Sequence, residues 1–574
     1  MSRRRARLTR HLTGLAFPVM AASLLASCAA GPAYDVVIRN GLLYDGSGLR
    51  PVKGDLAIRH DTIASVGPDA KGEGRLEIDA SGCAVSPGFI NMLSWANESL
   101  LEDGRSQSDI RQGITLEVMG EGWSMGPWNE QMKQHVRDRQ GDIKYEITWT
   151  TLGEYLETLE RRGISPNVAS FVGATTVRIH ELGEANRSPK ADELERMETL
   201  VRDAMAEGAL GVASALIYAP AFSATTEELV ALCRVASACG GTYISHIRSE
   251  GDRLLEAADE CVRIAREADI PAEIYHMKAA GASNWHKLDS LVALIERARA
   301  EGLQITADMY TYTAAATGLD AALPPWVQEG GLEECIRRLA DPGTRRRVLE
   351  EMSTPSGAWE NFFLAAGSAQ NILLAAFKQD SLKHLTGRTL ARVASERGRI
   401  PEETILDLIT HDRSRVGAVY FVMSEENVRR EIQLPWVSFG SDEESVAPEG
   451  VFLLSNHHPR AYGNVARLLG RYVRDERLIT LEEAVRRLTS LPAENLHLDH
   501  RGRLRPGYAA DVVVFDPELV EDHATYDQPH RYATGVRHVL VNGIRVLADG
   551  EHTGAMPGKV VRGRGWNGTR SLAE

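Results

Sequence analysis

The chain lacks a long internal apolar run, an excess of basic residues and a regular set of cysteines. No internal stretch is long and apolar enough to span a bilayer. The net charge is −14 over 574 residues, which argues against a nucleic-acid partner because phosphate binding requires basic patches. Apart from Cys28, the cysteines are five in number and irregularly spaced. Such a set does not make a disulfide framework.

The first residues differ in composition from the rest of the chain. Five arginines fall within the first ten positions, and an apolar stretch follows over 12–26. This order is typical of a secretory signal, so residues 1–27 are left out of the fold argument. The ending Leu25-Ala26-Ser27-Cys28 resembles a bacterial lipoprotein processing box, and we expect an exported, periplasmic lipoprotein anchored in the membrane by a lipid on Cys28. Ordinary cleavage within 26–30 is the alternative.

Strand signals at both ends of the chain indicate a small β-sandwich domain built from residues 28–86 and 496–574. Asn-Gly at 40–41 and again at 542–543 lies between apolar runs, a pattern that favours a two-residue hairpin turn. A further strand pair is suggested by the runs 55–58 and 62–66.

Between 87 and 495, short apolar runs alternate with amphipathic helical patterns. Eight runs resemble strands, at 89–93, 115–119, 168–172, 211–214, 242–245, 272–275, 304–307 and 436–439. Eight strands alternating with helices predict an α/β fold of the (β/α)8 barrel class rather than an open sheet. Residues 319–430 are mostly charged and helical in pattern, and we interpret them as a helical insertion before the last barrel strand, over the barrel mouth.

Two histidines, His246 and His276, carry the strongest functional signal. Each closes a strand-like run and precedes polar, Gly-containing sequence and a helical pattern. Asp442 lies in an acidic cluster that follows another apolar run. Imidazoles and a carboxylate at the C-terminal ends of barrel strands are the usual layout of a metal site. Either histidine alone would suggest an ordinary strand-end residue, and the repeated context favours the metal site.

A set of short segments spread along the chain forms a more specific pattern. The segments are 35–41, 87–90, 111–115, 207–211, 245–251, 276–281, 308–313, 440–442, 458–463 and 505–517. Together they resemble the N-acyl-D-amino-acid deacylase (D-aminoacylase) family of the amidohydrolase superfamily. The resemblance covers nearly the whole chain after the signal.

This resemblance implies roles for individual residues. His246 and His276 match histidines that hold zinc, and Asp442 matches the carboxylate that takes a proton from the metal-bound water. A zinc-bound water has a pKa of about 7, which suits such a base. The residues that grip the substrate carboxylate match Lys278, Tyr310 and Arg460. By residue type alone, alternatives stay open: Lys278 as a solvated loop lysine, Tyr310 as part of the packing of the barrel wall, and Arg460 as a partner in a surface salt bridge.

The chain departs from the family pattern on its first two barrel strands. Leu93 and Trp95 occupy the positions of the family's His-x-His, and neither binds a metal. On the second strand, with one residue deleted, Glu121 takes the place of a ligand cysteine. Two histidines with one glutamate are a known zinc ligand set. We therefore expect one zinc per chain, and the alternative is that Glu121 is a loop carboxylate and the third ligand comes from elsewhere.

A competing motif is Gly122-Trp123-Ser124-Met125-Gly126, which matches the Gly-x-Ser-x-Gly elbow of serine hydrolases. Proline and tryptophan follow it where the elbow requires a helix, which favours a chance match.

Our main hypothesis is a zinc-dependent amidohydrolase that cleaves the amide of N-acyl-D-amino acids or D-residue dipeptides. A zinc-bound hydroxide attacks, with Asp442 as general base. The alternatives are a barrel that has lost catalysis and binds a ligand, motivated by the missing His-x-His, and a serine hydrolase using Ser124. A substrate side-chain pocket is predicted at the start of the insertion, from Ala315 and the apolar residues within 323–326.

Overall fold

The centre of the protein is a ring of parallel strands. The computed structural model describes residues 33–68, 70 and 72–568. Its ring contains β6 (Phe89–Asn91), β7 (Ile114–Met119), β8 (Asn167–Ser170) continued by β9 (Val172–Gly173), β10 (Gly211–Ala215), β11 (Thr242–His246), β12 (Ala272–Ile274), β13 (Ile305–Met309) and β17 (Val437–Phe439). The amide of Met92 donates to the carbonyl of Phe439 at 3.2 Å and closes the ring between β6 and β17. The predicted eight-stranded barrel is confirmed.

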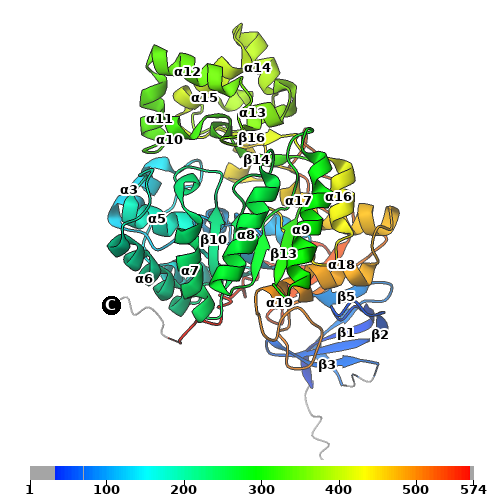
Figure 1. The fold of residues 1–574 in the computed structure, drawn as a ribbon. Coiled ribbons are helices and arrows are strands. Elements are labelled where there is room, and N and C mark those ends of the chain that lie inside the picture. The colour runs from blue at the N-terminus through cyan, green and yellow to red at the C-terminus, as the bar shows by residue number, and fades with distance from the viewer. Residues whose placement is uncertain (1–32, 69, 71, 569–574) are drawn as a thin grey trace, which may run out of the picture.

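Helices cover the outside of the ring (Figure 1). They include α3 (Glu130–Arg139), α4 (Leu152–Arg162), α5 (Ala174–Leu182), α6 (Ala191–Glu207), α7 (Thr226–Ala238), α8 (Leu254–Ala268), α9 (Leu288–Ala300), α16 (Glu425–Ile432), α17 (Arg460–Arg467), α18 (Leu481–Leu488) and α19 (Ser490–Asn495). Thr225 caps α7 by accepting the Glu228 amide, and Thr480 caps α18 in the same way. These two helices thus begin where a polar side chain satisfies a free N–H group, and each buries its apolar face.

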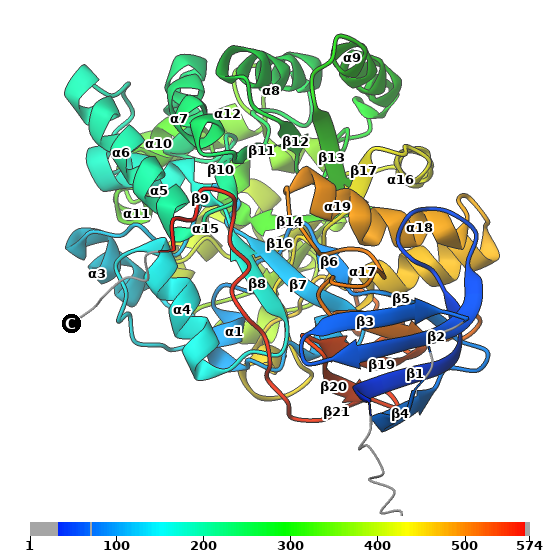
Figure 2. The same ribbon diagram turned by 90° about the horizontal axis from the view of Figure 1, so that it is seen from below.

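Both ends of the chain build one nine-stranded sheet, in the order β21-β20-β19-β18-β5-β1-β2-β3 with β4 beside β1. Its strands are β1 (Tyr34–Leu43), β2 (Val52–Arg59), β3 (Thr62–Gly67), β4 (Gly74–Asp79), β5 (Ala84–Pro87), β18 (Val512–Phe515), β19 (Val536–Val541), β20 (Ile544–Ala548) and β21 (Glu551–His552). Antiparallel pairing of β5 with β18 joins the two ends of the chain. Alternate side chains from both ends meet in a core of their own. Figure 2 shows this domain beside the barrel.

Only one of the two Asn-Gly pairs forms a hairpin turn. Asn542 and Gly543 connect β19 to β20 with positive φ at both positions, as a tight hairpin requires. Asn40 and Gly41 instead lie inside β1, where the pairing with β2 shifts register. The turn prediction there is wrong because Gly41 is needed for close packing: a Cβ at this position would lie 2.4 Å from a methyl group of Val85.

The insertion lies over the C-terminal ends of the barrel strands (Figure 1). Its helices are α10 (Pro325–Gln328), α11 (Leu332–Leu339), α12 (Pro342–Met352), α13 (Phe362–Ala365), α14 (Leu390–Arg397) and α15 (Pro401–Asp412). Beside these predicted helices it contains an antiparallel sheet that the sequence did not suggest, formed by β14 (Ala315–Gly318), β16 (Gly417–Tyr420) and β15 (Ile372–Ala376). This sheet lies over the barrel mouth.

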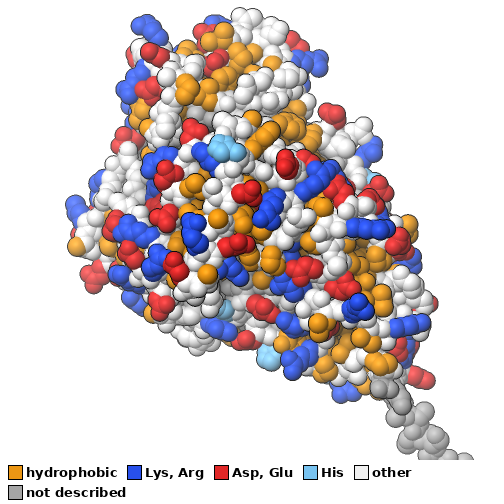
Figure 3. All heavy atoms as spheres, turned by 45° about the vertical axis from the view of Figure 1, so that its right-hand side comes forward, with side chains coloured by type: hydrophobic (Ala, Val, Ile, Leu, Met, Phe, Trp, Pro, Cys, Tyr) orange, Lys and Arg blue, Asp and Glu red, His pale blue; other side chains and the backbone are white. Residues whose placement is uncertain are grey.

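The segment after β21 runs along β8 and β9 (Figure 2), where the amide of Val561 donates to the carbonyl of Val168 at 2.8 Å. On the face in Figure 3, acidic and basic side chains are intermixed. Within the described ranges, no helix combines the length and apolarity needed to cross a membrane. Cys28 lies outside the described residues.

Candidate metal centre and its surroundings

Three buried side chains meet at the C-terminal ends of the barrel strands. His246 is the last residue of β11, His276 follows β12, and Glu121 follows β7. The Oε1 atom of Glu121 lies 2.8 Å from Nδ1 of His246 and 3.1 Å from Nε2 of His276. The two imidazole rings stand nearly perpendicular, with centroids 4.4 Å apart. The structure therefore brings together the three residues that were predicted as metal ligands.

The backbone around Glu121 and His276 is specialised for this arrangement. Glu121 stands between Gly120 and Gly122, which adopt φ of +107° and +65°. A Cβ on Gly120 would lie 2.5 Å from the carbonyl oxygen of Phe171. His276 itself has φ of +35°, a strained value for a residue with a side chain. Its amide donates to Oδ1 of Asp308 at 2.9 Å, which holds the strained turn in place.

A second set of charges lies behind His276. Oε1 of the buried Glu250 is 3.0 Å from Nδ1 of His276, and Nζ of Lys278 contacts both groups, at 2.6 and 2.8 Å. Burial and the Lys278 ammonium oppose protonation of His276, but the carboxylates around it outweigh them and raise its pKa to about 10. Glu121 shows the complementary shift: burial opposes its ionisation, yet the two histidines lower its pKa. The centre thus has a strong affinity for positive charge.

The donor set fits a zinc ion. Neighbouring ligand atoms around tetrahedral zinc lie about 3.3 Å apart, close to the two measured separations, and the candidate ligand atoms all lie within 4.8 Å of one another. Glu250 is placed to accept a hydrogen from Nδ1 of His276, which would free Nε2 for a metal. Leu93, fully buried against Gly440, supplies no donor atom. The geometry therefore suits one ion.

Asp442 and Arg460 form a second group beside the cluster. Asp442 follows β17 with φ of +51°, and its amide donates to the carbonyl of Leu93 at 2.8 Å. Nη2 of Arg460 lies 2.9 Å from Oδ2 of Asp442. Burial raises the pKa of Asp442 against the opposing effect of the Arg460 guanidinium. Asp442 is therefore a better proton acceptor near neutral pH than an ordinary aspartate.

The guanidinium of Arg460 also covers the ring of Tyr310, 4.3 Å from its centroid. Both residues are 1% exposed. Within the described residues, Nε and Nη1 of Arg460 and the hydroxyl of Tyr310 are buried without a hydrogen-bond partner. Buried donors rarely stay unpaired in a native protein, so this cradle is suited to an anionic group that bonds in two places. Lys278, 5.6 Å from the centroid of the same ring, adds positive charge.

Three residues that contact the candidate ligands were not predicted to do so from the sequence. Trp95, considered there only as a lost ligand, donates from Nε1 to Oε2 of Glu121 at 2.9 Å. Glu250 follows His246 by four positions. A carboxylate so near a candidate ligand in the sequence could have indicated a residue that orients the ligand. Tyr218 packs edge-on against His246 at 5.4 Å and bonds Thr317 of the insertion. Its position depends on the insertion, so nothing local in the sequence indicates it.

The structure contradicts the serine-nucleophile alternative. Ser124 is fully buried. Its hydroxyl donates to the carbonyl of Gly126 and accepts the amide of Gly173 at 3.0 Å. Among the described residues its hydroxyl has no histidine partner, and a buried serine bonded to backbone groups cannot act as a nucleophile.

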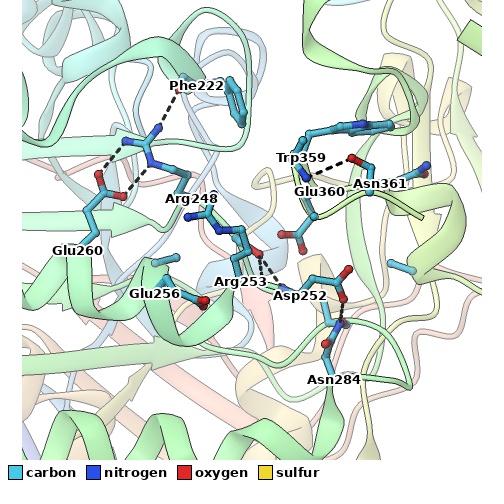
Figure 4. Close-up of a pocket in the computed structure, with 18 of the residues that line it drawn as sticks. Phe222, Arg248, Asp252, Arg253, Glu256, Glu260, Asn284, Trp359, Glu360 and Asn361 are labelled. Atoms are coloured by element: carbon cyan, nitrogen blue, oxygen red, sulfur yellow. Dashed lines mark hydrogen bonds and ion pairs between the residues drawn. The ribbon is translucent and has the colours of Figure 1, made fainter. Parts of the chain in front are cut away.

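The predicted apolar side-chain pocket lies away from the cluster. Pro324, Pro325 and Trp326 line a cavity of about 670 Å³ that none of the three candidate ligands borders. A neighbouring cavity of about 460 Å³ is lined by Arg248 and Asp252 of the loop after β11 and by Glu360 of the insertion (Figure 4). The Glu250 amide donates to Glu360 at 2.9 Å and ties this loop to the insertion. None of the three candidate ligands borders that cavity either, and the substrate pocket predicted from Ala315 and the apolar residues within 323–326 stays a prediction.

Comparisons with known proteins identify the family of the chain. A model of the amidohydrolase family matches residues 76–547. A D-aminoacylase of Alcaligenes xylosoxydans xylosoxydans is 32% identical over 92% of this chain and 97% of its own length.

Two solved structures are similar throughout. One is an N-acyl-D-glutamate deacylase of Bordetella bronchiseptica, complexed with zinc and a phosphonate inhibitor that mimics the tetrahedral intermediate. It is 30% identical with a TM-score of 0.76, and the match covers 92% of this chain and 99% of that one. The other is a D-aminoacylase with a binuclear metal centre, for which one-metal activation and second-metal attenuation are described. It is 32% identical with a TM-score of 0.76, and the match covers 92% of this chain and 100% of that one. The predicted family resemblance is confirmed, and the chain belongs to the amidohydrolase family.

Proposed function

We propose that the protein hydrolyses the amide bond of N-acyl-D-amino acids or D-residue dipeptides, with one zinc ion held by Glu121, His246 and His276. One observation carries this proposal: beside the candidate three-ligand metal centre, two guanidinium nitrogens of Arg460 and the hydroxyl of Tyr310 are buried without a hydrogen-bond partner among the described residues. The cradle suits the free carboxylate that neighbours the scissile amide. The preference for the D-configuration rests on the similarity to D-aminoacylase and N-acyl-D-glutamate deacylase.

The chain's own residues divide the chemistry between them. When bound, zinc supplies Lewis acidity, which makes water more acidic and polarises a carbonyl group. Asp442 accepts the proton of the attacking water at Oδ1, since Arg460 occupies Oδ2, and then returns it to the leaving amine. Arg460 and Tyr310 orient the substrate carboxylate, and Lys278 adds positive charge while paired with Glu250. Holding the carboxylate fixes the amide relative to the base.

The test uses the purified chain without its signal, loaded with zinc. We expect release of free amine from N-acetyl-D-amino acids and much slower release from the L-enantiomers. Removing the metal with a chelator abolishes hydrolysis, zinc restores it, and Glu121→Ala lowers the zinc content well below one per chain. A chain that retains zinc yet hydrolyses neither enantiomer would instead support the ligand-binding alternative.

We also propose that the protein is exported and anchored through a lipid on Cys28, which rests on the basic and apolar residues before that position. In a bacterial host, the full chain should incorporate labelled fatty acid and enter the membrane fraction. Cys28→Ser should lose the label. Labelling that persists in Cys28→Ser would refute the anchor at this position.

A further inference from the structure

The two oxygens of Glu121 have different partners. Oε1 faces both imidazoles, at 2.8 and 3.1 Å. Oε2 accepts the indole N–H of Trp95 at 2.9 Å. An indole nitrogen is only a donor and carries no lone pair for a metal. One oxygen of the Glu121 carboxylate therefore faces the candidate metal site, and the other is hydrogen-bonded to Trp95.

Trp95 is well fixed for such a role. Its amide donates to the carbonyl of Glu443 at 2.9 Å, and the amide of Ser94 donates to Val118 at the same distance. These bonds tie the segment 94–95 to β7 and to the loop that follows β17. The partly buried ring packs against the apolar interior of the barrel. The indole therefore reaches Glu121 from a rigid position, which restricts rotation of the carboxylate.

We propose that Trp95 is a positioning residue that makes Glu121 a one-oxygen ligand and limits the centre to a single metal ion. This inference rests on the proposed function. The N–H occupies Oε2, so Glu121 cannot turn to chelate one ion with both oxygens. The same N–H places partial positive charge where a second cation would approach Oε2. Leu93, the other side chain expected near that position, offers no donor atom.

The experiment measures metal binding rather than turnover. Wild type, Trp95→Phe and the control Trp128→Phe are stripped of metal and titrated with Zn²⁺ and Co²⁺. Trp128 is a matched control because its buried indole N–H bonds the Ser124 carbonyl at 3.0 Å instead of a candidate ligand. We expect Trp95→Phe to bind zinc about 10- to 100-fold more weakly, as for other groups that orient ligands. Trp128→Phe should keep the wild-type affinity.

The visible spectrum of the cobalt form reports ligand geometry. Weaker absorption in Trp95→Phe, from a higher coordination number once Glu121 binds through both oxygens, supports the proposal. If Trp95→Phe does not fold, an isosteric benzothienylalanine at position 95 removes the N–H and keeps the ring. Wild-type affinity and spectrum in these variants would overturn the inference and leave the proposed function intact. A wild-type chain that binds no metal would overturn both.

Discussion

Arg460 allows a quantitative test of the proposed carboxylate cradle. Two of its buried guanidinium nitrogens, Nε and Nη1, have no partner among the described residues. A hydrogen bond to a charged group contributes about 1.5–3 kcal/mol. Two such bonds to the substrate carboxylate would contribute about 3–6 kcal/mol, or about 10²- to 10⁴-fold in kcat/KM. Arg460→Met, which keeps an unbranched stem, should lose that much.

Arg460 also contacts Asp442, so a loss of activity alone is ambiguous. The assay is therefore a double cycle that measures kcat/KM of wild type and Arg460→Met on an N-acetyl-D-amino acid and on its carboxamide. Changes in the base affect both substrates and cancel. We expect Arg460→Met to act strongly on the acid and weakly on the carboxamide, with a coupling of about 3 kcal/mol or more.

A matched control comes from the same helix. Arg467 pairs with Asp522 and covers the ring of Tyr312, so Arg467→Met should show no coupling to the substrate carboxylate. Equal losses on the acid and the carboxamide in Arg460→Met would refute the cradle, whatever the absolute activity.

Three further predictions concern Asp442, Glu250 and Glu117. Asp442→Asn should lower kcat about 10²- to 10⁴-fold. Burial raises the pKa of Asp442, and the base must be ionised, so wild-type kcat/KM should fall with decreasing pH through a midpoint above about 4, the ordinary aspartate value. A lower midpoint would contradict this role. Glu250→Gln should weaken zinc binding about 10- to 100-fold in a competition assay, and unchanged affinity would argue against its contact with His276. Burial raises the pKa of Glu117 to about 7, so the folded state holds its proton above the unfolded value of about 4.3. The free energy of unfolding should decrease as pH rises between these values, by about 4 kcal/mol from this group, and Glu117→Gln should remove that share of the decrease. Equal pH slopes of the unfolding free energy in wild type and Glu117→Gln, measured by urea unfolding, would refute it.

The strand positions and the residues that meet in the candidate metal centre were largely predictable because both depend on local sequence. His246 and His276 close buried strands, and a parallel barrel necessarily places such ends together. The contacts of Trp95 and Glu250 were not predictable in detail, because they depend on side-chain directions across different strands. The sheet of the insertion pairs β14 with β16 across about a hundred residues, and none of its strands carries a strong local pattern. At Asn40-Gly41, pairing with neighbouring strands overrode local turn preference.

The ring closes between β6 and β17, the first and last strands of the barrel, and this order affects when the parts of the site are synthesised. Glu121, His246 and His276 all precede residue 277 in the chain, so a ribosome delivers the three candidate ligands early. Asp442 arrives only after the insertion has been made, and its amide docks on the carbonyl of Leu93 across the seam. The three candidate ligands are therefore all synthesised well before the proposed base. The proposed base joins the site only when the last strand closes on the first, and a chain arrested before β17 would lack Asp442 and be unable to turn over substrate.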